Sequence, residues 1–304
     1  MRIKKLSLTC IVMLSLIFIS SCSKTDNPTN KVIRNNIDRT SGYKAPDGTF
    51  VGPRGRVNKD LTPKDIGPYG KRKKIKGNLT IEEDSATYKN IDVDGVIFVK
   101  ADNVTISNFT AQRVTQDPGN TGMLLEDGKI DGQNKKNDGI QWSNFTVRRT
   151  EITRTFDGIK AMGDVVIQDN YIHDLDAFNS KDAGEGGYSH NDCVQISAKS
   201  NILIERNWFN NCGYNSAIFV DPDQAPISNV TIQHNYLNGG GITLYVIASR
   251  RVDNGVPSKV TVSNNVFGIN HEFDFAAVGK DVVFIDNVTI NNEVIKARYD
   301  DDES

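Results

Sequence analysis

Short stretches in which apolar and polar residues alternate recur along the chain from about residue 77. One pattern reads apolar-x-apolar-x-x-Asn-x-apolar, with clear copies at Val165 to Ile172, Ile202 to Phe209, Val230 to Leu237 and Val260 to Phe267. The second pattern is a short apolar strand after a small or acidic pair, as in Asp157-Gly158-Ile159-Lys160. Alternation with period two over so few residues predicts β-strands rather than helices.

The strands of the second pattern are spaced like the coils of a solenoid. They begin at Ile140, Ile159, Val194, Ile218 and Ile242, which are 19, 35, 24 and 24 residues apart. One coil cannot bury its own apolar face, so stacked neighbours must form the core. Four asparagines share one position of the first pattern and are expected to form an internal ladder: Asn170, Asn207, Asn235 and Asn265. The sequence therefore predicts an all-β, right-handed parallel β-helix over residues 76–297.

The N-terminus has the features of an export signal. A basic start is followed by an apolar stretch, shorter than a membrane span, that ends in Ser20-Ser21-Cys22. This resembles the processing site of bacterial lipoproteins, and it predicts a signal peptide over residues 1–21 and a lipid anchor at Cys22. An ordinary signal peptide that happens to contain this cysteine is the alternative. Residues 22–75 are then a tether and an N-terminal cap, and residues 298–304 are an acidic tail.

Composition narrows the function only slightly. The net charge is −2, which gives no sign of nucleic-acid binding. After signal removal about 280 residues remain, enough for one domain with a large core, and we expect a monomer. Cys193 and Cys212 can pair in an oxidising compartment, or they can be two buried thiols.

One position in each short strand should face solvent, because its two neighbours are apolar. The predicted outward row is Gln141, Lys160, Gln195, Phe219 and Thr243. Three long spacers, at 112–137, 176–190 and 246–258, are predicted to be insertions that rise as loops around this face. Loops around a rigid scaffold often build binding sites, so a groove with Lys160 near its middle is expected.

Lys160 is the leading catalytic candidate. A lysine among glutamines and carboxylates can act as a general base towards the proton beside a uronate carboxylate, where its surroundings disfavour its charge. His190 and Tyr188 are candidates for proton transfer, and Arg154 for neutralising a carboxylate. Further contacts to substrate are expected from Gln141, Gln195, Asp157, Asp192, Tyr245 and Arg250. Each of these residues also has a plain structural or solvated interpretation.

A row of aspartates supports a rival hypothesis. Asp138, Asp157 and Asp192 each precede a short strand, so neighbouring coils bring their carboxylates close together. Two of them can serve as the acid and base of an inverting glycosidase, although the spacing between coils is short for that reaction. The row can also bind Ca²⁺. The structural alternative is that each aspartate bonds its own backbone at a turn.

The repeat, with Asp157-Gly158-Ile159-Lys160 and His190-Asn191-Asp192-Cys193-Val194-Gln195, resembles the parallel β-helix polysaccharide lyases of bacteria, alginate lyases among them. The similarity covers about residues 77–297 and includes no complete family signature. It implies cleavage of an acidic polysaccharide such as alginate by β-elimination, in some families with Ca²⁺. Two other hypotheses stay open: an inverting hydrolase using Asp157 and Asp192, and a surface lipoprotein that binds glycan without cleaving it.

Overall fold

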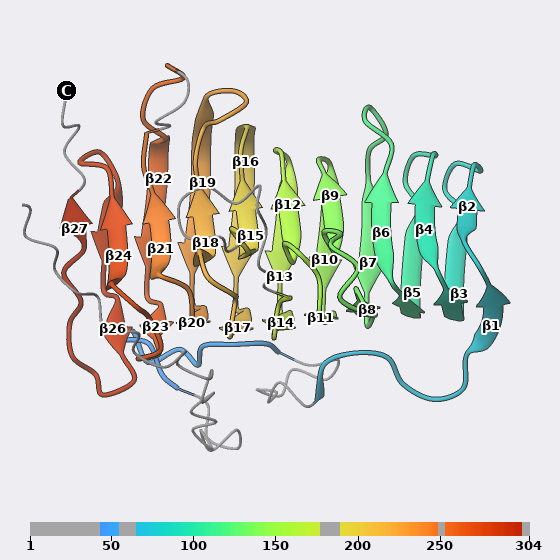
Figure 1. The fold of residues 1–304 in the computed structure, drawn as a ribbon, viewed down its shortest axis with the longest axis horizontal. Coiled ribbons are helices and arrows are strands. Elements are labelled where there is room, and N and C mark those ends of the chain that lie inside the picture. Colours follow the sequence, from blue (N-terminus) through green and yellow to red (C-terminus); the bar gives the residue numbers. More distant parts are fainter. Residues whose placement is uncertain (1–42, 55–64, 177–188, 249–252, 300–304) are drawn as a thin grey trace, which may run out of the picture. The chain divides into compact units, whose positions relative to one another are not determined.

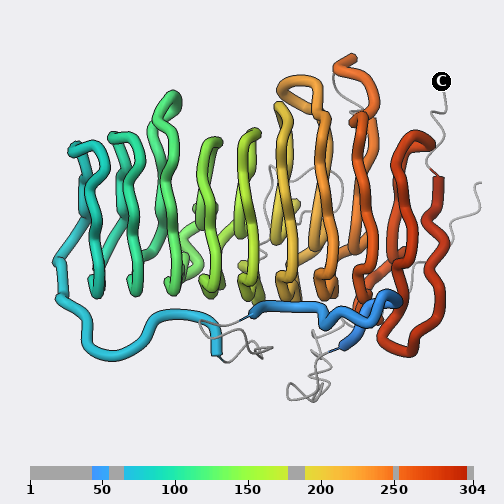
Figure 2. The backbone as a smooth tube through the Cα atoms, turned by 180° about the vertical axis from the view of Figure 1, so that it is seen from behind, coloured from blue at the N-terminus to red at the C-terminus, as the bar shows by residue number. Residues whose placement is uncertain are grey.

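The alternating stretches of the sequence form two all-parallel β-sheets that wind around a common core. The structure, a computed structural model, describes residues 43–54, 65–176, 189–248 and 253–299. All of them belong to one unit, residues 39–304. The predicted parallel β-helix is confirmed: the coils stack in chain order from β1 to β27 (Figures 1 and 2).

One sheet has ten strands, one from each coil. They are β2 (Leu79–Ile81), β4 (Val96–Val99), β6 (Arg113–Gln116), β9 (Ile140–Trp142), β12 (Ile159–Ala161), β15 (Asp192–Ile196), β18 (Ser216–Val220), β21 (Ile242–Val246), β24 (Asp274–Val278) and β27 (Arg298–Tyr299). In the eight strands from β4 to β24, its inward row is buried and apolar: Ile97, Val114, Ile140, Ile159, Val194, Ile218, Leu244 and Ala276.

The other sheet has seventeen strands, because most coils supply two. They are β1 (Lys73–Lys76), β3 (Thr87–Asp94), β5 (Thr105–Ala111), β7 (Met123–Glu126), β8 (Lys129–Asp131), β10 (Phe145–Arg148), β11 (Glu151–Thr153), β13 (Val165–Gln168), β14 (Tyr171–His173), β16 (Lys199–Glu205), β17 (Trp208–Asn210), β19 (Ile227–Gln233), β20 (Tyr236–Asn238), β22 (Ser258–Ser263), β23 (Val266–Phe267), β25 (Val283–Ile285) and β26 (Val288–Thr289).

A buried asparagine ladder fixes the bend between paired strands such as β16 and β17. Oδ1 of Asn207 accepts hydrogen bonds from N and Nδ2 of Asn170, at 2.9 and 3.0 Å. The same pattern continues through Asn235 and Asn265, as predicted, and extends one coil further to Asn287. The residue before each ladder asparagine has a positive φ, which turns the chain, so the ladder compensates for an unfavourable backbone conformation.

Residues 112–137 are not an insertion, contrary to the prediction. They hold β6, β7 and β8, and so form a coil of their own. The long spacing suggested an insertion because no strand of the second pattern is evident in the sequence before Ile140. The segment 246–258 does leave from the far end of β21 and leads to β22, while most of 176–190 lies outside the described residues.

Residues 43–54 and 65–70, here called the N-terminal strap, run along one side of the coils (Figures 1 and 2). Tyr43 stacks on Tyr236, with ring centroids 5.4 Å apart. The backbone N of Arg54 donates to Asp169 at 2.8 Å, and that of Tyr69 donates to Asn108 at 2.7 Å. We expected a cap over an open end of the β-helix. The described part of this segment crosses the turns of several coils, at Asn108, Asp169 and His234.

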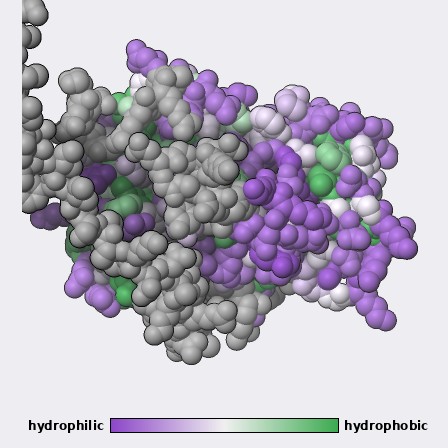
Figure 3. All heavy atoms as spheres, in the orientation of Figure 1, coloured by the Kyte–Doolittle hydropathy of each residue, from purple (hydrophilic) through white to green (hydrophobic). Residues whose placement is uncertain are grey.

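On the face drawn in Figure 3, the described residues are mainly hydrophilic, and hydrophobic residues form small separate areas. The described residues include no helix with the length and apolarity that a membrane span requires. A cavity of about 460 Å³ lies beside β1, β3, β5 and β8, and its lining includes Lys74, Asp92, Asp94, Gln112 and Asp131.

Candidate functional site

The outward row of the ten-stranded sheet runs across the strands, one residue per coil. Its register is Thr115, Gln141, Lys160, Gln195, Phe219, Tyr245. Lys160 lies in the middle of β12 with Gln141 and Gln195 directly beside it on β9 and β15. The predicted row is therefore correct in four of its members, and polar and aromatic side chains stand side by side along it.

Thr243 does not belong to this row, contrary to the prediction. Ile218 pairs with Leu244 rather than with Ile242, so Tyr245 lies beside Phe219, and Thr243 is fully buried. The error came from aligning Ile218 with Ile242. In the structure Ile242 is level with Ser216, the first residue of β18, so the apolar residues of β21 begin two positions earlier in register. Phe219 and Tyr245 meet edge to face, with ring centroids 5.8 Å apart.

Arg113 is a member of this surface that the sequence analysis missed. Its guanidinium donates to the amide oxygen of Gln141, and the amide nitrogen of Gln141 donates to Asp138. A chain of polar contacts thus links β6 to the start of β9 and fixes the side chain next to Lys160. Recognising residues 112–137 as a coil would have revealed Arg113 as the start of a strand.

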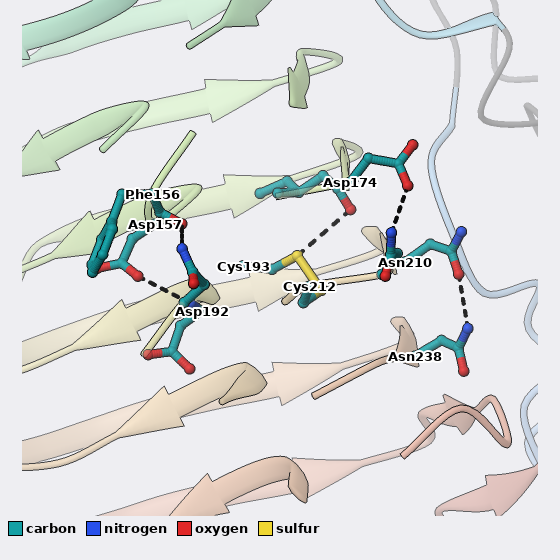
Figure 4. Close-up of a disulfide and its surroundings, with 11 residues drawn as sticks. Phe156, Asp157, Asp174, Asp192, Cys193, Asn210, Cys212 and Asn238 are labelled. Carbon is teal, nitrogen blue, oxygen red and sulfur yellow. Dashed lines mark hydrogen bonds between the residues drawn. A yellow bond between two sulfur atoms is a disulfide. The ribbon is translucent and has the colours of Figure 1, made fainter. Parts of the chain in front are cut away.

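The aspartate row forms a second ladder, beneath the outward row. Oδ1 of Asp157 accepts the backbone N–H of Asp192 at 2.9 Å, and Oδ1 of Asp138 accepts that of Asp157 at 3.3 Å. Each carboxyl therefore bonds the backbone of the next coil and not its own turn, which corrects the structural interpretation of the row. Asp157 and Asp192 are each only 1% exposed, and Figure 4 shows the bond between them.

Burial makes the charged forms of these two carboxyls costly. It raises the pKa of Asp157 to about 8, with a further contribution from the nearby charge of Asp138. Burial and the charge of Asp157 likewise hold the pKa of Asp192 well above its ordinary value. Asn215 partly offsets this, because its Nδ2 donates to both oxygens of Asp192, at 2.9 and 3.2 Å. Near neutral pH the pair therefore retains protons that exposed aspartates would lose.

Lys160 contacts this buried row from the outside. Its Nζ lies 4.0 Å from Oδ2 of Asp157, and its side chain is 29% exposed. The lysine thus lies between the buried carboxyls and the outer surface. The raised pKa of Asp157 removes most of the negative charge of this carboxyl at neutral pH, which weakens its ion pair with the lysine.

His190 is exposed and precedes Asp192 by two residues. The next residue, Asn191, is buried and donates to the backbone oxygens of Phe156 and Asp176, at 2.8 and 3.0 Å. These bonds fix the entry to β15 at the same coil boundary as Asp157. His190 therefore lies beside the start of β15. Among the residues that the structure describes, it makes no interaction with Lys160.

Arg154 forms a salt bridge within the protein. Its guanidinium binds the carboxylate of Asp131, which lines the cavity beside β1, β3, β5 and β8. Nearly half of its side chain is exposed. This cavity lies beside the seventeen-stranded sheet, whereas the groove predicted around Lys160 would lie on the ten-stranded sheet. Three other predicted residues, Tyr188, Arg250 and Cys22, lie outside the described residues.

Cys193 and Cys212 form a disulfide, which settles the choice between a bond and two thiols (Figure 4). Both cysteines are fully buried, and Cys193 directly follows Asp192. The bond connects β15 to the segment that follows β17, and that segment carries Asn215. It therefore ties the donor of the Asn215–Asp192 contact to the strand that carries the acceptor.

Within the described ranges, no three His, Cys, Asp or Glu side chains are grouped so that they could hold a metal ion. Comparisons of the chain with protein-family models, with curated proteins and with solved structures found no match. The structure therefore establishes the fold, a parallel β-helix.

Proposed function

We propose that this protein is a lyase that cleaves an acidic, uronate-containing polysaccharide such as alginate by β-elimination. The observation that carries the proposal is the position of Lys160, partly exposed in the middle of an outward row and directly beside Gln141 and Gln195. In this reaction a base removes the proton beside the uronate carboxylate, the bond to the leaving oxygen breaks, and a double bond forms in the sugar ring. The proposal gives Lys160 the role of base.

The surface around Lys160 suits a linear polymer. The row crosses the strands, so successive coils present side chains at intervals of about 4.8 Å. Gln141 and Gln195 offer amide donors and acceptors to sugar hydroxyls, and Phe219 and Tyr245 offer ring faces for stacking. Arg113, next to Gln141, adds a positive charge for a uronate carboxylate. His190, which is exposed beside the start of β15, is the candidate for protonating the leaving oxygen.

The hydrolase alternative has one observation in its favour. The pKa of Asp157, raised to about 8, would suit a general acid at neutral pH. However, Asp157 and Asp192 are almost completely buried and accept ladder hydrogen bonds, so neither presents an oxygen to a polymer on the outer face. We therefore favour the lyase, in which the partly exposed Lys160 contacts the substrate.

We further propose that the chain is exported and lipid-anchored at Cys22. The support is the basic and apolar N-terminus of the sequence together with the buried disulfide, because disulfides persist mainly in oxidising compartments. Labelling cells with a radioactive fatty acid tests the anchor. Label on the wild-type protein and none on a Cys22→Ala variant is the expected result, and equal label on both would contradict it.

The lyase proposal is tested with the soluble protein that starts after Cys22, incubated with a panel of uronate polymers. Ultraviolet absorbance follows the unsaturated product, with and without Ca²⁺. We expect a rise on one polymer and a loss of kcat/KM of about 100-fold or more in Lys160→Ala. Lys89→Ala is the matched control, since Lys89 is an exposed lysine on the other sheet. New reducing ends without absorbance would indicate hydrolysis, and binding without turnover would indicate a glycan-binding protein.

A further inference from the structure

The contact between Lys160 and Asp157 is asymmetric in a way that suggests a role for the carboxyl. Oδ1 of Asp157 is occupied by the backbone N–H of Asp192, at 2.9 Å, whereas Oδ2 lies 4.0 Å from Nζ of Lys160. The carboxyl of Asp157 is 1% exposed and is held in place by the ladder. The side chain of Lys160, in contrast, reaches the surface. Asp157 can therefore influence the reactive group without touching a substrate.

Three charged groups face Asp157 from the elements packed against it. Asp138 faces it from the coil of β9, Asp192 from β15, and Lys160 from its own strand, β12. The charge of Asp138 disfavours its ionisation, whereas the backbone N–H of Asp192 and the charge of Lys160 favour it. Because burial and Asp138 raise the pKa of Asp157 to about 8, this carboxyl changes charge close to neutral pH, next to Lys160.

We propose that Asp157 is a positioning residue that controls how readily Lys160 releases its proton. This inference rests on the proposed function, in which the free amine of Lys160 takes the proton beside the uronate carboxylate. When Asp157 is ionised, its charge stabilises the ammonium form of the lysine. When Asp157 carries its own proton, that attraction is absent, and the ammonium gives its proton to water more readily, leaving the amine.

The test measures the reactivity of Lys160 directly. The folded soluble protein is treated with limiting acetic anhydride, which reacts only with free amines, and mass spectrometry compares acetylation of Lys160 with that of the exposed Lys89. Asp157→Asn removes the charge but keeps an oxygen for the N–H of Asp192. At pH values above about 8 we expect this variant to raise the ratio of Lys160 to Lys89 labelling by about fivefold or more. The difference should shrink at lower pH, where wild-type Asp157 is protonated.

Asp286→Asn is the matched control, because it makes the same change in net charge at an exposed position on a distant coil. It should leave the labelling ratio unchanged. A ratio in Asp157→Asn that equals the wild-type ratio at every pH would overturn the proposal. Should Asp157→Asn fail to fold, the wild-type protein alone still decides: its Lys160 to Lys89 ratio must fall as the pH rises through about 8.

Lyase activity is measured in parallel on the same samples. With an active wild-type protein, the pH at which kcat/KM reaches half of its maximum should be lower in Asp157→Asn than in wild type or Asp286→Asn. If the wild-type protein cleaves no polymer while the labelling ratio shifts as expected, the proposed function fails and the coupling between the two side chains stands. If cleavage depends on Lys160 but neither readout shifts, only the role of Asp157 fails.

Discussion

Oδ1 of Asn235 accepts hydrogen bonds from both the backbone N and the side-chain Nδ2 of Asn207, at 2.9 and 3.0 Å. Nδ2 of Asn235 in turn donates to the backbone oxygens of Ile204 and Gln233. One fully buried side chain thus satisfies backbone groups on two coils. The ladder holds the bends of the seventeen-stranded sheet in register.

Asn235→Ala should therefore be strongly destabilising. The substitution leaves the buried N–H of Asn207 without an acceptor and removes the side-chain hydrogen bond that Asn235 donates to Asn265. We therefore expect the free energy of unfolding to fall by about 3 kcal/mol or more. Urea denaturation measures it. The exposed Asn291 supplies the control, and Asn291→Ala should stay within about 0.5 kcal/mol of wild type. Equal effects of the two substitutions would contradict a structural ladder.

The raised pKa of Asp157 predicts a pH dependence of stability. Its folded-state pKa of about 8 lies above the ordinary value of 3.8, so the folded protein binds more protons between these limits. The contribution is fully present below about pH 4 and is lost as the pH rises through about 8, with a slope of up to about 1.4 kcal/mol per pH unit. Asp157→Asn should flatten the dependence measured by urea denaturation across this range. An unchanged slope would show that this carboxyl is ionised in the folded protein.

The disulfide should contribute to stability by restricting the unfolded chain. Cys193 and Cys212 are 19 residues apart, and closing a loop of that length is worth about 3 kcal/mol. The double variant Cys193→Ala and Cys212→Ala should lose roughly that amount in denaturation experiments. Its stability should also be indifferent to reducing agent, whereas that of the wild-type protein should fall. A wild-type protein that reductant leaves unaffected under unfolding conditions would argue against the bond.

Gly52 provides a specific test of the strap. Its φ is +96°, and an added Cβ would lie 3.1 Å from Cε3 of Trp208. Gly52→Ala should therefore displace the strap from Trp208, and quenching of tryptophan fluorescence by acrylamide should increase. Gly48→Ala is closely matched, because φ is +83° there and nothing lies within 4 Å of an added Cβ. Both variants carry the backbone strain of about 1 kcal/mol, so a difference in quenching reports the contact alone.

The repeat was predictable because its pattern is local. An apolar alternation followed by asparagine appears in every clear copy, and the same residues form the buried ladder from Asn170 to Asn265. Register was harder to predict, since the apolar residues of one strand can begin two positions earlier than those of its neighbour without altering the alternation. Thr243 and Tyr245 have the same parity, and only the pairing of β18 with β21 shows which of them lies beside Phe219.

For the candidate site, the sequence predicts which residues face outward but not which side chains they contact. Gln141, Lys160 and Gln195 follow from alternation within each strand. The salt bridge of Arg154 with Asp131 and the bond of Asn215 to Asp192 depend on which coils lie next to each other, and insertions of unequal length conceal that. The disulfide was left open for the same reason, because a spacing of 19 residues does not say whether two cysteines meet.

The strap also changes how the solenoid should respond to denaturation. In a simple stack each coil contacts only its neighbours, so the ends can melt while the middle persists. Here one short segment of chain bonds to Asn108, Asp169 and the backbone of His234, which belong to coils that are far apart in the stack. Loss of one coil would weaken the attachment of the others through this shared segment. Unfolding of this β-helix should therefore be one cooperative transition rather than gradual fraying from its ends.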